Sequence, residues 1–178
     1  MEEAEISTEH LQEEMHHHAQ SAGQSWIMGV ALTSALLAVL AAVAALLSGH
    51  HANEAMIEQM KASDAWSYYQ AKGIKAAVLG SKIDFRRALK QPLGPGDDDK
   101  LVQYADEQAK ISVEAKELEA SSRRHLHTHE IFAGAVTLFQ VAIGIAAIAA
   151  LTRKRRFWLV SMSFGALGLV VFALGFLT

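Results

Sequence analysis

The fold is decided by one long stretch, residues 26–90, which reads WIMGVALTSALLAVLAAVAALLSGHHANEAMIEQMKASDAWSYYQAKGIKAAVLGSKIDFRRALK. Its first part, from Trp26 to Leu47, contains no charged residue, whereas its second part carries charges throughout. No proline interrupts either part or the junction between them. Because proline in a helix interior removes a backbone hydrogen bond and clashes with the preceding turn, its absence lets one helix continue from apolar into polar sequence.

A stripe of small residues runs along this whole stretch, at positions that alternate three and four residues apart. Of its sixteen positions, twelve are Ala, Ser or Gly. This spacing is the seven-residue period of a coiled coil, and it predicts a single helix over residues 27–90, on the order of 95 Å long at ~1.5 Å per residue. The stripe consists of Ala31, Ser34, Ala38, Ala41, Ala45, Ser48, Ala52, Ala55, Gln59, Ala62, Trp66, Tyr69, Gly73, Ala76, Gly80 and Ile83.

One turn follows this helix, at Pro92-Leu93-Gly94-Pro95-Gly96, and Asp97-Asp98-Asp99 comes directly after it. Prolines and glycines break a helix and favour a turn, while acidic residues suit the positive end of the next helix dipole. The return helix repeats the three-four spacing, so the two helices are predicted to pack as an antiparallel hairpin. Its stripe is Leu101, Tyr104, Gln108, Ile111, Ala115, Leu118, Ser122, His125, His129 and Phe132.

Three uncharged runs are long enough to cross a membrane, since roughly 20 apolar residues span a hydrocarbon layer of ~30 Å. They are Trp26–Leu47, Ile131–Leu151 and Phe157–Leu177. The expected fold class is therefore all-α: three transmembrane helices, with a long coiled-coil-like hairpin between the first and the second. The expected parts are an acidic tail (1–25), a transmembrane helix (26–48), an extramembrane hairpin (49–130, turn at 91–97), two further transmembrane helices (131–151 and 157–178) and a basic loop between them (152–156).

Composition and missing motifs argue against several function classes. The chain has no cysteine, which excludes disulfides and thiolate sites. The acidic start lacks the basic residues of a cleavable signal peptide. No ionisable residue lies within the three runs, which disfavours a proton-coupled transporter. Phosphate-binding loops and nucleophile motifs are absent, and the basic residues of the hairpin alternate with acidic ones, so we expect neither an enzyme nor a nucleic-acid partner.

The orientation is indicated by Thr152-Arg153-Lys154-Arg155-Arg156, which links the last two runs and should be cytoplasmic by the positive-inside tendency. That assignment puts the hairpin outside the cell membrane. Four basic residues near the membrane ends of the hairpin, Lys61, Lys116, Arg123 and Arg124, leave the opposite orientation open.

Two segments carry a family resemblance: Trp66-Ser67-Tyr68-Tyr69-Gln70-Ala71-Lys72, and His129 to Ala133 with its continuation Val136-Thr137-Leu138-Phe139-Gln140. Through them the chain resembles an uncharacterised bacterial membrane family that is catalogued as a domain of unknown function, over most of residues 26–178. The resemblance implies a protein of the bacterial inner membrane. It implies no activity, substrate, cofactor or catalytic residue.

Histidines gather where the hairpin meets the membrane and form the best candidate metal site. His125 and His129 are four residues apart, so both lie on one helix face, as metal-binding histidine pairs do. If the two membrane boundaries are level, His50, His51 and Glu54 lie across from them. Imidazoles with a carboxylate suit Zn²⁺, Cu²⁺ or non-haem iron. The alternative is that these amphipathic side chains are satisfied by neighbouring backbone and water.

The leading functional expectation is a structural or scaffolding protein that forms homo-oligomers in the lipid bilayer and projects its hairpin. A lone two-helix hairpin buries little surface, so such a protomer needs neighbours. Two alternatives stay open: a metal-binding or redox-accessory subunit that uses the interfacial histidines, and an oligomeric pore. A protein partner at the hairpin tip is also open, and no cofactor is indicated.

Overall fold

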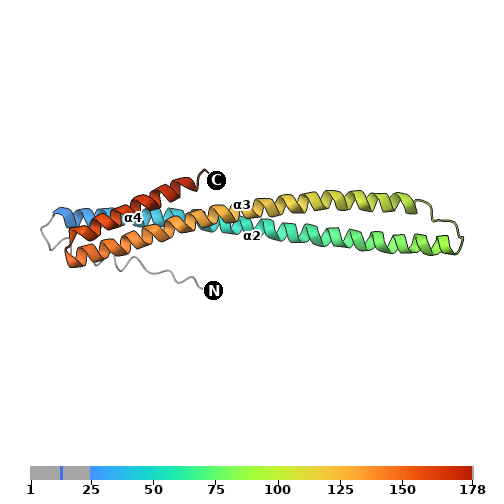
Figure 1. Ribbon diagram of the computed structural model, residues 1–178, viewed down its shortest axis with the longest axis horizontal. Helices are drawn as coiled ribbons and strands as arrows, with labels where there is room; N and C mark the ends of the chain where they lie inside the picture. Colours follow the sequence, from blue (N-terminus) through green and yellow to red (C-terminus); the bar gives the residue numbers. More distant parts are fainter. Residues whose placement is uncertain (1–12, 14–24, 178) are drawn as a thin grey trace. The chain divides into compact units, whose positions relative to one another are not determined.

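The computed structural model describes residue 13 and residues 25–177, and within them all regular structure is helical. The helices are α2 (Ser25–Ala88), α3 (Asp97–Thr152) and α4 (Arg155–Leu174), in that order along the chain (Figure 1). The predicted all-α class, with two long helices joined by a single turn, is therefore confirmed. The acidic tail expected at residues 1–25 lies outside the described residues, except for residues 13 and 25.

The first predicted helix is continuous, because α2 runs for 64 residues without a break between residues 48 and 60. Of the sixteen stripe positions on α2, only Ala45 and Gln59 are exposed, and no stripe position of α3 is exposed. The stripes that the spacing predicted are thus the buried faces of both helices. The connection between α3 and α4 is shorter than the predicted loop, since only Arg153 and Lys154 lie between the two helices.

The chain divides into two compact units, which are described separately. Of the described residues, the first unit, here called the bundle unit, comprises those up to 52 together with residues 126–177. The second, here called the hairpin unit, comprises residues 53–125.

The core of the bundle unit is built by α2 and α3 from small residues with a few large ones between them. Its main cluster contains Leu37, Ala41 and Ala44 from α2, and Ala135, Phe139, Ala142 and Ile143 from α3. Bilayers give apolar side chains no drive to leave lipid, so helices in them associate through close packing and hydrogen bonds. Alanine-rich contacts satisfy that requirement because they let the two backbones approach.

A small-residue stripe that was not recognised from the sequence seats α4 on the other two helices. It consists of Ser161, Gly165 and Gly168, with Gly175 directly after the helix, and all four are buried. The Ser161 hydroxyl donates to the Ala142 carbonyl oxygen at 2.6 Å. A Cβ atom on Gly168 would lie 2.8 Å from the Phe139 ring, so this glycine is what allows the ring to pack there.

The hairpin unit packs residues 53–88 of α2 against residues 97–125 of α3 (Figure 1). Two contacts reach from a side chain of α3 to the backbone of α2: Ser122 Oγ donates to the Ala55 carbonyl oxygen at 2.8 Å, and Gln108 Nε2 donates to that of Tyr69 at 3.2 Å. A third joins side chains, where Trp66 Nε1 donates to a Glu119 carboxylate oxygen at 2.8 Å. These bonds fix the register of the two helices.

All three helices are long and apolar enough to cross a membrane. The bundle unit also exposes large apolar side chains that water would not favour, including Leu32, Leu36, Leu46 and Val170. An exposed apolar surface of this kind marks a surface that meets lipid or another protein.

Substituting Gly168 tests how α4 is held. We expect Gly168→Ala to force the Phe139 ring aside and to lower the stability of the bundle unit by roughly 1–3 kcal/mol, the usual cost of overpacking. Gly144→Ala is the matched control, because a Cβ there would meet nothing within 4 Å. Thermal unfolding of both variants in one detergent measures the difference. Equal stability of the two variants would contradict the packing of α4.

Candidate functional site

Two histidines of the predicted metal site, His50 and His51, follow one another on α2 in the bundle unit. Their ring centroids are 5.4 Å apart, and His51 also stacks on Phe132 of α3, with 5.8 Å between centroids and 12° between ring planes. His50 is exposed, whereas His51 is half-buried. The stacking orients the His51 ring against α3.

His129 of α3 is held by Ser48 of α2, also within the bundle unit. Its Nδ1 atom lies 2.9 Å from the Ser48 hydroxyl and 2.9 Å from the Ser48 carbonyl oxygen. When Nδ1 carries the proton it can donate to the carbonyl, and when it does not it can accept from the hydroxyl. In both states Nδ1 serves a helix contact, so coordination of a metal by His129 would fall to Nε2.

The remaining two members of the predicted site, Glu54 and His125, belong to the hairpin unit, and both are half-buried. Over residue 13 and residues 25–177, no group of three or more His, Cys, Asp or Glu side chains is placed to hold a metal ion. Metal binding by His50, His51, Glu54, His125 and His129 therefore stays a prediction from the sequence. What the structure does show is that His51 and His129 take part in packing α2 against α3.

Inside the hairpin unit, Lys72 forms a bridge that sequence reasoning missed. It pairs with Glu107, and its Nζ atom lies 5.1 Å from the centroid of the Tyr68 ring and 5.5 Å from that of Tyr104. Only 12% of its side chain is exposed. Lys72 is therefore held between the two helices rather than on a solvated surface. The reason is the register, because Lys72 and Glu107 face each other only once both helices are paired.

This bridge shifts both of its charged groups toward ionisation. The hydrogen bond to Glu107, followed by that to Tyr68, raises the pKa of Lys72 above its ordinary value. Hydrogen bonds from Lys72 and then from Gln103 lower the pKa of Glu107. A carboxylate and an ammonium group that stabilise each other in this way form a structural cross-link between the helices.

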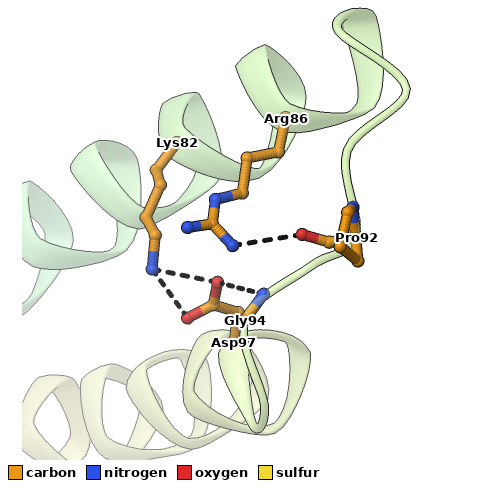
Figure 2. A network of polar contacts seen from close by, with 5 residues as sticks. All are labelled: Lys82, Arg86, Pro92, Gly94 and Asp97. Atoms are coloured by element: carbon orange, nitrogen blue, oxygen red, sulfur yellow. Dashed lines mark hydrogen bonds and ion pairs between the residues drawn. The ribbon is translucent and has the colours of Figure 1, made fainter.

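A second charged network closes the turn between α2 and α3 (Figure 2). Lys82 Nζ lies 3.0 Å from each carboxylate oxygen of Asp97, and the Gly94 amide donates to the same carboxylate at 3.1 Å. Arg86 donates to the Pro92 carbonyl oxygen at 3.1 Å. The hydrogen bond from Lys82 is the main cause that lowers the pKa of Asp97. The prediction that Asp97-Asp98-Asp99 start a helix is confirmed, and Asp97 in addition ties that start to α2.

Gly94 in this turn has no room for a side chain, since a Cβ there would lie 2.7 Å from an Asp97 carboxylate oxygen. The glycine thus lets the carboxylate reach the Gly94 amide. Both charged networks have the geometry of structural bridges, in which each ionised group faces a partner on the other helix or in the turn. A protein partner at the tip is not tested by these contacts.

Comparison with known proteins gives one finding. The family described as "Domain of unknown function (DUF4337)" matches residues 26–178. The chain belongs to this family. The DUF4337 match begins at Trp26, where the first apolar run begins, and it includes both units, so the resemblance inferred from the sequence is confirmed. No curated protein and no solved structure matches the chain.

The charged bridges predict how the stability of the hairpin unit depends on pH. Because Asp97 and Glu107 have lowered pKa values when folded, they stabilise the hairpin above the ordinary carboxyl range, and this stabilisation is lost as pH falls through the folded pKa values. Lys72, with a raised pKa, stabilises below the ordinary lysine range, and its contribution is lost at higher pH. The unfolding temperature of the hairpin, followed by circular dichroism, should therefore fall at both low pH and high pH.

The double variant Asp97→Asn/Glu107→Gln tests the loss of stability at low pH. We expect it to be less stable than the wild type near neutral pH and to lose less stability on acidification. Asp106→Asn, which changes an exposed carboxylate on the same helix, should keep the wild-type acid dependence. If the double variant kept the full acid dependence, the bridges would not be its cause.

Proposed function

We propose that this member of the DUF4337 family is a non-enzymatic, multi-pass protein of the bacterial inner membrane that self-assembles in the bilayer and presents its hairpin unit as a scaffold. Three helices of sufficient length and apolarity support the membrane location. The charged bridges of the hairpin unit support a structural role, because Lys72, Lys82, Asp97 and Glu107 join its two helices.

The observation that carries self-assembly is Gln140, which lies in the middle of the uncharged run of α3 with its side chain exposed. Within the described residues its amide has no hydrogen-bond partner. Other exposed polar side chains in these runs are satisfied by their own helix: Thr137 donates to Ala133 and Ser163 to Leu159. An amide in hydrocarbon without a partner is costly, and polar side chains in such positions join helices. A second copy supplies the missing partner.

The small-residue stripe of α2 packs inside the protomer and is not free to contact another copy. Ala41 is part of the core between α2 and α3, and Ser34 is fully buried. A larger residue at these positions would therefore disturb the protomer itself. The residues that face outward from the bundle unit, Gln140 among them, are the ones available to contact another copy.

Removing the Gln140 amide should weaken assembly without unfolding the protomer. Cross-helix hydrogen bonds in membranes contribute roughly 0.6–2 kcal/mol each, so Gln140→Leu should reduce association about 3- to 30-fold for each bond lost. Thr137→Val is the control, since the hydroxyl it removes is bonded within its own helix. Fluorescence energy transfer between labelled copies in liposomes measures association. Unchanged transfer for Gln140→Leu would contradict this role of the amide.

The proposed orientation puts the basic segment Arg153–Arg156 in the cytoplasm and the hairpin in the periplasm. Because the chain has no native cysteine, Gln91→Cys gives a single label site in the turn, where Gln91 is exposed. Gly94 is unsuitable for this purpose, since a side chain there would strike Asp97. An impermeant thiol reagent should label Gln91→Cys in spheroplasts. Labelling only after the membrane is opened would put the hairpin in the cytoplasm.

A further inference from the structure

The hairpin unit has a second face with a coiled-coil period, on the side of α2 away from α3. Its nine positions alternate three and four residues apart, and eight of them are uncharged. With 3.6 residues per turn, this stripe lies nearly opposite the buried Ala55, Ala62 and Ile83. We name it the outer face of α2, and it consists of Ile57, Met60, Asp64, Ser67, Ala71, Ile74, Val78, Ser81 and Phe85.

The outer face exposes large apolar side chains to an unusual degree for a helix outside the apolar runs. Met60 is 57% exposed, Ile74 and Val78 are each 66% exposed, and Phe85 is 67% exposed. The two serines need no polar partner on another helix, because the Ser67 hydroxyl donates to the Ser63 carbonyl oxygen and the Ser81 hydroxyl donates to that of Ala77. Apolar residues with this period are typical of a helix-pairing seam, and Asp64 is the one charged position on it.

Along the hairpin unit, α3 offers no comparable face. Between residues 97 and 125, its exposed large apolar residues are Val102 and Val113, and charged residues surround them. Pairing through the hairpin unit would therefore bring α2 against α2.

The charges beside the outer face decide the direction of such a pair. One border carries Lys61, Lys75 and Lys82, whereas the opposite border carries Ser63, Gln70 and Ala77, with Asp84 as its one charge between residues 63 and 84. In a parallel pair each border meets the opposite border of the other copy, so the lysines face uncharged residues. In an antiparallel pair each border meets itself, so lysines oppose lysines. Copies inserted the same way in one bilayer are also parallel.

The size of the outer face indicates what kind of partner it suits. Residues 57–85 extend about 42 Å along the helix, and a strip ~10 Å wide gives on the order of 400 Å² per copy. The resulting total of roughly 800 Å² is below the ~1,200 Å² at which stable interfaces between freely diffusing proteins begin. Such a contact needs a partner that is already held nearby. A second copy in the same membrane meets that condition, whereas a soluble protein does not.

We propose that the outer face of α2 is an interface between two copies of this chain, with their α2 helices parallel and in register. This inference rests on the proposed self-assembly. It identifies a surface outside the apolar runs through which the copies contact each other. Like residues then meet along the seam, so Met60, Ile74 and Ser81 each face the same residue of the other copy.

Single cysteines in the otherwise cysteine-free full-length chain test the register directly. A disulfide requires Cα atoms about 4.4–6.8 Å apart, which paired seam positions satisfy. In native membrane vesicles treated with a mild oxidant, we expect Met60→Cys, Ile74→Cys and Ser81→Cys each to form a covalent dimer. Val113→Cys, an exposed apolar position on α3, is the matched control for random collision and should form at least several-fold less.

Three results would overturn the proposal. Cross-linking of Ile74→Cys no faster than that of Val113→Cys would show that the outer face is not an interface. Cross-linking of Met60→Cys/Ser81→Cys without that of either single variant would show an antiparallel pair. The mass of each uncross-linked variant in lipid discs, measured alongside, separates this inference from the proposed function. An oligomeric mass without cross-links along the outer face would contradict this inference but not self-assembly. A monomeric mass would contradict both self-assembly and this inference.

Discussion

Close approach of two backbones is the constraint on which this structure depends. Stripe residues no larger than alanine or serine let α2 and α3 pack together, at Ala41 and Ser48 in the bundle unit and at Ala55 and Ala62 in the hairpin unit. The same requirement recurs in α4, where Gly165 and Gly168 accept Leu37 and Phe139. In lipid, where burial of apolar surface gives no gain, contact area and a few hydrogen bonds supply the association energy. Examples are the hydrogen bonds that Ser161 donates to Ala142 and that Trp158 donates to Thr33.

Sequence reasoning recovers most of the fold, because the information is periodic. A three-four spacing without proline predicts both a continuous helix and its buried face, and fourteen of the sixteen stripe positions on α2 are at least partly buried. The α4 stripe was missed for a physical reason: in a run of 20 residues rich in Gly and Leu, several spacings look equally good. Its seating depends on where Leu37 and Phe139 point, which sequence spacing does not define.

The candidate site was less predictable than the fold, since it depends on the register between distant segments. Ser48 was assigned only as a small stripe residue, yet it bonds His129, which is 81 residues away. Nothing in the spacing singles out Lys72, although Glu107 and two tyrosine rings enclose it. Three contacts share one register, because the two residue numbers of each pair add up to 177: 48 with 129, 55 with 122, and 69 with 108. One confirmed contact would therefore have located the others. Metal binding by the histidines stays a prediction.

Self-assembly is the central claim, and it accounts for two features that a single protomer leaves unexplained: an amide exposed in an apolar run at Gln140, and an apolar seam exposed along residues 57–85 of α2. The most direct test is the mass of the wild-type particle, measured by native mass spectrometry from lipid discs and from several mild detergents. The account predicts a multiple of the 19.3 kDa chain mass. A particle that stays at the mass of one chain under all these conditions would contradict it.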